Sequence, residues 1–325
     1  MSEPAADDAR WMAGAASLAA RGRPLSCPNP AVGALVVSDG IVVGRGWTQA
    51  GGRPHAEAVA LEQAGEAARG ATLFVTLEPC AHQSDRGPAC ADLVAATALQ
   101  RVCIGSEDPD PRTAGAGIAA IRAAGIDTEV IASPEAEASL AGYLMLRRHG
   151  RPHVTLKLAL SIDGCLAWPP SGERWLTGDI ARAHCHAMRA KCDAILVGGG
   201  TLRADQPRLD VRLPGLEQRS PERWVLTRGT APQGWRALPS PEAIRDMNEV
   251  QYLFVEGGAE TASAFVEAGL VDSLVIYRAP VTIGAGVPAL HQFAQGAMAG
   301  WRLDDSRPLG KDTLEVYRKS PCSPE

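Results

Sequence analysis

The sequence predicts an α/β protein with two domains. Segments typical of strands alternate with segments typical of helices, and the alternation begins again after a basic turn at residues 147–152. A chain of 325 residues suits two domains of about 100 to 200 residues each. We therefore expect domains at residues 1–148 and 149–325, each with its own hydrophobic core.

The first half has the element order of an α/β sandwich. A helix is expected over residues 8–20, followed by strands at 31–37 and 41–47 that are joined by the turn Ser38-Asp39-Gly40. The same reasoning predicts helices at 56–64, 90–99 and 117–124, strands at 72–77, 102–105 and 127–131, and a short helix from Ser133.

The second half predicts another α/β unit. The expected elements are strands at 154–160, 194–197, 224–227, 252–255 and 273–278, and helices at 180–191 and 261–268. Residues 214–221 are expected to form a loop, and no internal repeat is visible.

Four residues of the first half form a pattern that indicates hydrolytic metal chemistry. His55, Cys80 and Cys90 are suitable zinc ligands, and a catalytic zinc site uses three protein ligands and leaves the fourth position to water. Bound zinc lowers the pKa of that water to about 7. Glu57 is then placed to move a proton from the water to a leaving amine. This is the signature of the zinc nucleobase deaminases.

Two other interpretations of this pattern stay open: a closed, structural zinc site, and unrelated thiols near a chance histidine. A closed site would need a fourth ligand, for which His82 is a candidate, but such a site has no use for Glu57. In an open site, His82 would instead hydrogen-bond the substrate. We expect all three ligands at helix starts, where the partial positive charge favours thiolates.

Composition limits the partners. The net charge is −5 and Lys is scarce, whereas polynucleotide binding relies on clustered Lys and Arg. A small-molecule substrate is therefore favoured over nucleic acid. No apolar run is long enough to span a membrane and the N-terminus lacks the order of a signal peptide. We expect a cytoplasmic protein that forms a homo-oligomer, with its remaining cysteines unpaired.

Longer motifs in the first half resemble one family. Pro28 to Gly33, Pro54 to Glu57, Thr76 to His82 and the wide gap to Cys90 are similar to the bifunctional riboflavin-biosynthesis deaminase/reductases. The gap is one residue longer than is usual there, with Gln83 to Asp85 as the expected insertion. The resemblance implies a cytidine-deaminase-like α/β/α sandwich that binds one zinc ion.

The resemblance also implies substrate contacts in the first half. Asn29, His82 and Arg86 are expected at the phosphorylated pyrimidine, with Arg86 near the phosphate. Asn29 lies between two prolines, so the alternative is that it is only a turn residue.

In the second half, the segment Lys157 to Gly164 resembles the opening strand and turn of the family's reductase domain. This implies a dihydrofolate-reductase-like fold that uses NADPH. By this resemblance the substrate contacts are Arg189, Leu209, Arg212 and Glu256. The implied NADPH contacts are Ala159, Trp175, Thr201, Asp205, Gly258, Ala259, Glu260, Thr261, Ala262, Ser263 and Ala264.

Several residues of the second half have simpler alternatives. The arginines could form a solvated face, and Glu256 could only cap the helix after Gly258. The triplet Gly198 to Gly200 could approach a pyrophosphate or form a tight turn, but Arg203 breaks the Rossmann fingerprint. A second metal site is the alternative for the group His184, Cys185, His186 and Cys192.

We expect a two-step enzyme of riboflavin synthesis. Zinc-dependent deamination of a diaminopyrimidinone ribosylamino phosphate would precede NADPH-dependent reduction of its ribosyl chain. The segment between Arg212 and Gln251 is shorter than is usual in the family, and the loop from Ser171 to Trp175 lacks one residue. The alternatives are a deaminase whose second domain binds without reducing, and a nucleic-acid-editing deaminase.

Overall fold

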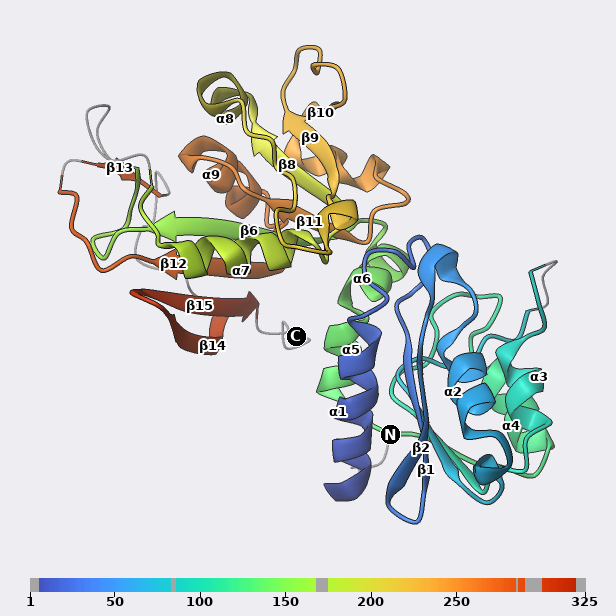
Figure 1. The fold of residues 1–325 in the computed structure, drawn as a ribbon. Coiled ribbons are helices and arrows are strands. Elements are labelled where there is room, and N and C mark those ends of the chain that lie inside the picture. Colours follow the sequence, from blue (N-terminus) through green and yellow to red (C-terminus); the bar gives the residue numbers. More distant parts are fainter. Residues whose placement is uncertain (1–5, 83–85, 168–174, 285, 290–299, 320–325) are drawn as a thin grey trace. The chain divides into compact units, whose positions relative to one another are not determined.

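A computed structural model describes residues 6–82, 86–167, 175–284, 286–289 and 300–319. The chain divides into two compact units, Met1–Gly150 and Arg151–Glu325, and each has its own sheet (Figure 1). The boundary expected after residue 148 falls in the last turn of a helix, α6, which continues to His149. The expected insertion at Gln83 to Asp85 and residues 171–174 of the shortened loop lie outside the described residues.

The described strands of the first unit form a mixed five-stranded sheet in the order β2-β1-β3-β4-β5. β1 pairs antiparallel with β2 and β3, while β3, β4 and β5 run parallel. The strand bounds are β1 Gly33–Ser38, β2 Ile41–Trp47, β3 Thr72–Val75, β4 Arg101–Ile104 and β5 Asp127–Val130.

Helices cover both faces of this sheet, because its strands carry apolar side chains on both sides. Ala34 and Val36 of β1 belong to the cluster that includes residues of α2, α3 and α4, whereas Leu35 and Val37 pack with α1 and α5. The expected α/β/α sandwich is confirmed. The helix bounds are α1 Ala6–Ala19, α2 Ala56–Ala64, α3 Cys90–Ala95, α4 Ala116–Ala123, α5 Pro134–Ser139 and α6 Ala141–His149.

Two helices of the first unit differ from the sequence expectation. α3 ends at Ala95 rather than at residue 99, and the hydroxyl of Thr97 donates back to the carbonyl of Leu93 at the end of the helix. The short helix expected from Ser133 is two helices, α5 and α6. Ser133 caps the first of them by accepting the N–H of Ala136 at 3.1 Å.

The described strands of the second unit form an eight-stranded sheet in the order β10-β9-β8-β11-β6-β12-β15-β14. All but the last two run parallel. Their bounds are β6 His153–Leu160, β8 Ala194–Gly198, β9 Glu222–Leu226, β10 Arg236–Leu238, β11 Tyr252–Val255, β12 Ser273–Arg278, β14 Trp301–Leu309 and β15 Asp312–Lys319.

Three of these strands, β10, β14 and β15, were not expected from the sequence. β10 and β14 are edge strands, and β14 is rich in charged residues and largely exposed. Such strands lack the apolar run or clean alternation on which strand prediction depends. Their pairing is therefore decided by long-range contacts.

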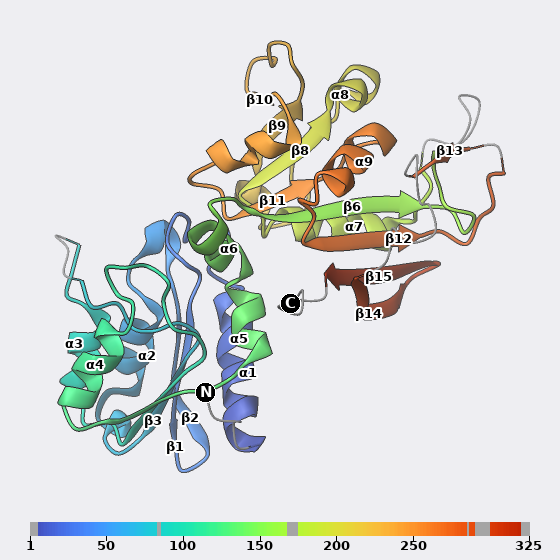
Figure 2. The same ribbon diagram turned by 180° about the vertical axis from the view of Figure 1, so that it is seen from behind.

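The helices α7, Asp179–Arg189, and α9, Ala259–Glu267, cover opposite faces of this sheet (Figures 1 and 2). A short helix, α8, Gly199–Asp205, begins directly where β8 ends. The described part of this unit has 3-10 segments at Glu217–Arg219, within the loop expected at 214–221, and at Pro241–Asp246. β7, Cys165–Ala167, pairs with β13, Val287–Pro288, in a separate two-stranded sheet.

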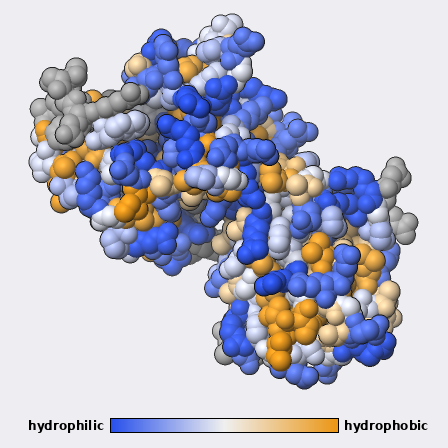
Figure 3. All heavy atoms as spheres, in the orientation of Figure 1, coloured by the Kyte–Doolittle hydropathy of each residue, from blue (hydrophilic) through white to orange (hydrophobic). Residues whose placement is uncertain are grey.

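No helix among the described residues has the length and apolar character needed to cross a membrane. On the face of each unit shown in Figure 3, hydrophilic residues predominate and hydrophobic ones form small patches.

Candidate active sites in the two units

In the first unit, the three residues predicted to bind metal lie together. The ligand atoms of His55, Cys80 and Cys90 are all within 4.8 Å of one another. Nδ1 of His55 is 3.2 Å from Sγ of Cys90 and 3.5 Å from Sγ of Cys80. Adjacent N and S ligands of a tetrahedral zinc ion are about 3.5 Å apart, given ordinary zinc bond lengths. The residues therefore fit zinc.

The cluster contains three ligands, and no fourth His, Cys, Asp or Glu of the described chain joins it. His82 is not part of it. Within the described residues the arrangement is that of an open, catalytic site rather than a closed structural one.

Two of the three ligands lie at helix starts, as expected, and the third does not. His55 is the N-cap of α2, and Cys90 is the first residue of α3. Cys80 is instead in the loop after β3. The backbone N–H of Cys90 nevertheless points to the sulfur of Cys80, with the nitrogen and Sγ 3.4 Å apart. The helix start thus still favours a thiolate at Cys80.

The ligands influence one another's protonation. The hydrogen bond from the Cys90 thiol lowers the pKa of Cys80 well below its usual range. Because Cys90 donates this bond, the pKa of Cys90 is raised. Burial lowers the pKa of His55. The hydrogen bond with Cys80 and the charges of Glu57 and Cys80 outweigh burial, so that the pKa of His55 is raised overall. Cys80 is thus the ligand most readily held as a thiolate, the form that binds a metal ion.

Glu57 is the second residue of α2 and is buried, with 3% of its surface exposed. Burial raises the pKa of its carboxyl, and the nearby His55 opposes that shift. A raised pKa makes the carboxylate a better proton acceptor, as a group that moves a proton from water to a leaving amine needs to be. The proton-transfer role of Glu57 stays a prediction.

A cavity of about 210 Å³ opens over these residues. Six of the seven residues predicted for this site line it, all except Cys90: Asn29, His55, Glu57, Cys80, His82 and Arg86. Polar residues that were not predicted from the sequence also line it: Thr48, Arg53, Glu78, Asp108, Asp110, Arg112, Tyr143 and Arg147.

One signal could have identified part of the missed set. Asp108 and Asp110 follow β4, so they lie at the same sheet edge as Cys80, which follows the parallel neighbour β3. Asp108 is buried and accepts a hydrogen bond from Tyr143 at 2.8 Å. Burial raises the pKa of Asp108. The hydrogen bonds that it accepts from the backbone N–H of Asp110 and from Tyr143 oppose this rise.

Glu78 organises the loop that carries these aspartates. Its buried carboxylate accepts the backbone N–H groups of Asp108, Gly115 and Ile118 at 3.0–3.2 Å. Gly117 allows the close approach of α4, because a Cβ there would lie 2.0 Å from the carbonyl of Pro79. Glu78 is therefore a structural carboxylate beside the metal ligands.

Predicted substrate residues surround the cavity. The side-chain amide of Asn29 donates to the carbonyl of Gly52 at 3.0 Å, so it braces the segment before His55. Nδ1 of His82 is buried and has no hydrogen-bond partner in the described structure. Arg86 is exposed and donates to the carbonyl of Gly51 at 2.6 Å. These contacts do not test substrate binding, which stays a prediction.

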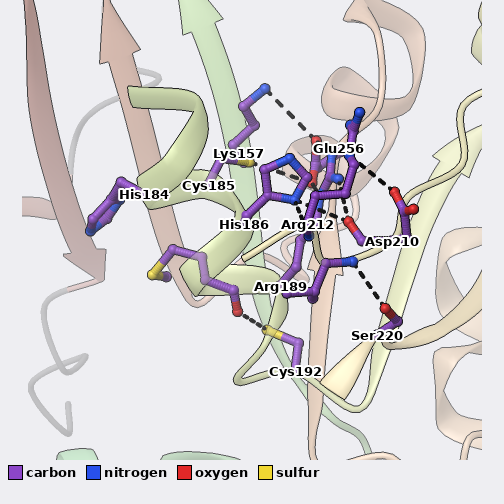
Figure 4. A network of polar contacts seen from close by, with 12 residues as sticks. Lys157, His184, Cys185, His186, Arg189, Cys192, Asp210, Arg212, Ser220 and Glu256 are labelled. Atoms are coloured by element: carbon purple, nitrogen blue, oxygen red, sulfur yellow. Dashed lines mark hydrogen bonds and ion pairs between the residues drawn. The ribbon is translucent and has the colours of Figure 1, made fainter. Parts of the chain in front are cut away.

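In the second unit, Glu256 is the centre of a charged cluster (Figure 4). Arg189 donates two hydrogen bonds to its carboxylate, and Nζ of Lys157 lies 3.9 Å from it. Sγ of Cys185 is 3.6 Å from Oε1 of Glu256. α9 has no side-chain cap, so the alternative that Glu256 only caps this helix is wrong.

The other predicted substrate residues lie close to this cluster. Arg189 also donates to the carbonyl of Asp210, while Arg212 is half-exposed and lies 3.3 Å from the carboxylate of Asp210. Leu209 is buried with φ 54°, a left-handed conformation that is unusual for leucine. The guanidinium of Arg189 is thus already paired, and its expected contact with the substrate stays a prediction.

The second metal site considered for this region is not formed. The side chain of His184 contacts Tyr277 at 2.8 Å, that of His186 the carbonyl of Asp210, and that of Cys192 the carbonyl of Met188. Figure 4 shows His184 pointing away from His186. The cause is that neighbouring residues of a helix face different directions.

A second cavity, of about 390 Å³, lies where β8 and β11 end. Five predicted NADPH contacts line it: Thr201, Gly258, Ala259, Glu260 and Thr261. The triplet Gly198 to Gly200, Leu226 and Val287 complete its walls. A Cβ on Gly198 would lie 2.2 Å from Oγ1 of Thr261, so glycine lets α9 approach β8 closely. Backbone N–H groups at two helix starts suit a pyrophosphate.

The remaining predicted cofactor residues do not line this cavity. Ala262 is packed in the core with Phe265. Consecutive helical residues face different directions, so the seven residues from Gly258 to Ala264 cannot all face one ligand. Ala159 lies on β6, Asp205 is exposed at the end of α8, and Trp175 is exposed beside Arg182.

Comparison with known proteins identifies the family. The model of the cytidine and deoxycytidylate deaminase zinc-binding region matches residues 5–106, and that of the RibD C-terminal domain matches residues 152–241 and 237–314. The riboflavin biosynthesis protein RibD of Escherichia coli is 34% identical over 94% of this chain and 97% of its own length. The chain belongs to the RibD family.

Other RibD proteins are also similar to this chain over nearly its whole length. RibD of Haemophilus influenzae is 33% identical and covers 98% of this chain and 99% of its own. The structure of Acinetobacter baumannii RibD has a TM-score of 0.82 at 32% identity, covering 97% of this chain and 99% of that one. The deaminase/reductase of Thermotoga maritima has a TM-score of 0.84 at 28% identity, covering 96% and 99%.

Family membership confirms the fold class and the general function. The chain is a bifunctional deaminase/reductase of riboflavin biosynthesis, with a zinc-binding deaminase domain and a RibD reductase domain that uses NADPH.

Proposed function

We propose that this chain deaminates 2,5-diamino-6-ribosylamino-4(3H)-pyrimidinone 5′-phosphate and then reduces the ribosyl chain of the product. The observation that carries the first step is the cluster of three ligand atoms beside a cavity that His55, Cys80 and the buried Glu57 line. A three-ligand site leaves a position for water, and the cavity gives the pyrimidine access to it.

In the first step, water replaces the 2-amino group of the pyrimidine. His55, Cys80 and Cys90 hold zinc, which when bound makes water nucleophilic near neutral pH. The Glu57 carboxylate takes a proton from the attacking water and returns it to the leaving amino group, which departs as ammonia. Its raised pKa, caused mainly by burial, suits both transfers.

The surrounding residues orient the pyrimidine. Asn29 and His82 line the cavity with hydrogen-bonding atoms, and Nδ1 of His82 is buried without a partner. A buried polar atom of this kind is satisfied when a ligand supplies the matching group. Arg86 at the rim would meet the phosphate.

In the second step, the bond between the anomeric carbon and the ring oxygen of the ribose breaks, and the ring oxygen takes a proton and becomes a hydroxyl of the ribityl chain. NADPH, when bound, would supply the hydride to the anomeric carbon. Gly258 to Thr261 and Thr201 would hold the cofactor in the cavity at the ends of β8 and β11. Lys157, Glu256 and Arg189 form the charged cluster against which the substrate binds, with Arg212 near its phosphate.

Incubation of the purified protein with the diaminopyrimidine phosphate tests both steps. We expect release of ammonia without NADPH, and with NADPH a further product and consumption of one cofactor per substrate. Ammonia release with no NADPH consumption would favour a non-reducing second domain, and no release would contradict the proposal. Homo-oligomer formation stays a prediction, to be tested by light scattering.

A further inference from the structure

Arginines surround the deaminase cavity. Among the described residues that line it are Arg53, Arg86, Arg112 and Arg147. Two of them share one carboxylate: Arg112 is 2.6 Å and Arg147 is 3.4 Å from Oδ2 of the buried Asp110. The charges of these two guanidinium groups are therefore partly compensated inside the protein.

Arg53 differs from that pair. Its one hydrogen bond in the described structure runs to the carbonyl of Pro88, at 3.3 Å, and no described carboxylate lies within ion-pair distance. A carbonyl contact leaves the positive charge uncompensated and occupies one of five N–H donors. Arg53 is partly buried, so this charge is held at the cavity instead of being free in solvent.

Arg53 and Arg86 connect the same two loops in opposite directions. Arg53 reaches from the loop before His55 to Pro88, while Arg86 reaches back from the loop before Cys90 to Gly51. Both side chains line the cavity at the point where these loops meet. Their guanidinium groups are therefore positioned by the scaffold that also carries two zinc ligands.

Four carboxyl groups also line the cavity, those of Glu57, Glu78, Asp108 and Asp110, so an anion is favoured only beside the arginines. The planar guanidinium of arginine suits phosphate because it can donate two parallel hydrogen bonds.

We infer that Arg53 is a specificity-determining residue of the deaminase, which binds the 5′-phosphate of the substrate together with Arg86. This inference rests on the proposed function. It goes beyond it by assigning recognition of the phosphate to a residue beside the metal site, in the loop that leads to His55.

The inference predicts a selective defect. Arg53→Gln should lower kcat/KM for the phosphorylated substrate by about 10- to 100-fold, the effect of one charge-assisted hydrogen bond. It should change kcat/KM for the dephosphorylated compound much less. Inorganic phosphate should also compete with the substrate less well in this variant. A purely structural role would reduce activity on both compounds equally.

The experiment compares wild type, Arg53→Gln, Arg53→Lys and the control Arg45→Gln on both compounds, with zinc content measured for each. Arg45 is exposed on β2 and does not line the cavity, so its variant should keep the wild-type preference for phosphate. Arg53→Lys keeps the positive charge but lacks the planar guanidinium that donates two parallel hydrogen bonds. Its preference for the phosphorylated compound should therefore be intermediate.

An unchanged preference in Arg53→Gln and Arg53→Lys would overturn the inference. If Arg53→Gln loses zinc, the test rests on Arg53→Lys. A reduced preference of Arg53→Lys for the phosphorylated compound supports the inference, and a wild-type preference overturns it. Absence of wild-type deamination of both compounds would instead show that the proposed function is wrong.

Discussion

Arg189 binds Glu256 through two parallel hydrogen bonds, from Nε to Oε1 at 2.6 Å and from a terminal nitrogen to Oε2 at 3.0 Å. The pair joins the last turn of α7 to the residue after β11, and the two side chains are 11% and 9% exposed. Burial would raise the pKa of Glu256, but Lys157 and Arg189 outweigh it and lower the pKa. Glu256 is therefore kept ionised in the reductase site.

We predict that Arg189→Ala destabilises the second unit. Removing one partner of a buried ion pair leaves an uncompensated charge and typically costs about 3 to 5 kcal/mol. Urea unfolding followed by circular dichroism measures the effect without depending on reductase activity. Arg182→Ala on the same helix is the control, because its partner Asp179 is exposed and such surface pairs contribute about 1 kcal/mol or less. Equal midpoints for the two variants would contradict the prediction.

Zinc should be present at about one ion per chain. Chelation should abolish ammonia release and leave reduction of the deaminated compound intact, because the two sites belong to separate units. Elemental analysis and paired assays measure this. A variant such as Cys90→Ala should lose the metal. A fourth protein ligand in a zinc-bound structure would show that the site is structural.

Glu57→Gln should separate metal binding from catalysis. Glutamine keeps the size and hydrogen bonding of the side chain but cannot carry the proton, a role worth about 10² to 10⁴ in rate. Zinc content and reductase activity should stay near wild type while deamination falls by this factor. Loss of zinc, or full deaminase activity, would mean that Glu57 is not the proton carrier.

Asp163 should control NADPH affinity through a loop. Its carboxylate accepts the backbone N–H groups of Ile283 and Gly284 at 2.7–3.2 Å, and the same segment leads to Val287 in the cofactor cavity. We expect Asp163→Ala to raise the Kd of NADPH several-fold, measured by fluorescence titration, with deamination unchanged as the internal control. An unchanged Kd would show that the loop holds its position without this contact.

The ion pair between Arg151 and Asp272 should make the stability of the second unit depend on pH. Their side chains are 2.7 Å apart and largely buried. Burial raises the pKa of Asp272, but the bond from Arg151 outweighs it, so the folded pKa lies below 3.8. The unfolded chain therefore binds the proton more tightly, and the stabilisation is present above about pH 4 and lost as pH falls through the lower, folded pKa.

Asp272→Asn tests this dependence. We expect a lower urea midpoint than wild type from pH 7 to about pH 5, and a difference that shrinks below about pH 4. A difference that grows with acidity would show that the sign is wrong.

The sequence by itself determined the metal centre and the order of most elements. His55, Cys80 and Cys90 could be identified because zinc accepts few side-chain types, and Glu57 because its spacing from His55 is local. Buried strands such as β8 and β11 were also predictable, since their apolar runs reflect burial on both faces. Family motifs added the predicted NADPH contacts at Thr201 and at the start of α9, which line one cavity.

The tertiary structure alone decided which distant residues share a site. The deaminase cavity is lined by Arg53, Asp108 and Tyr143, which come from loops and a helix up to 90 positions apart in the chain. No periodic pattern in the local sequence indicates that these residues lie together. The pairing of Arg189 with Glu256 spans 67 residues, so the sequence showed the arginine but not that its donors are already used. The hairpin of β14 and β15 is charged and half-exposed, so only pairing with β12 defines it. Side-chain chemistry and periodicity are local properties, whereas these contacts depend on how the sheets bring remote segments together.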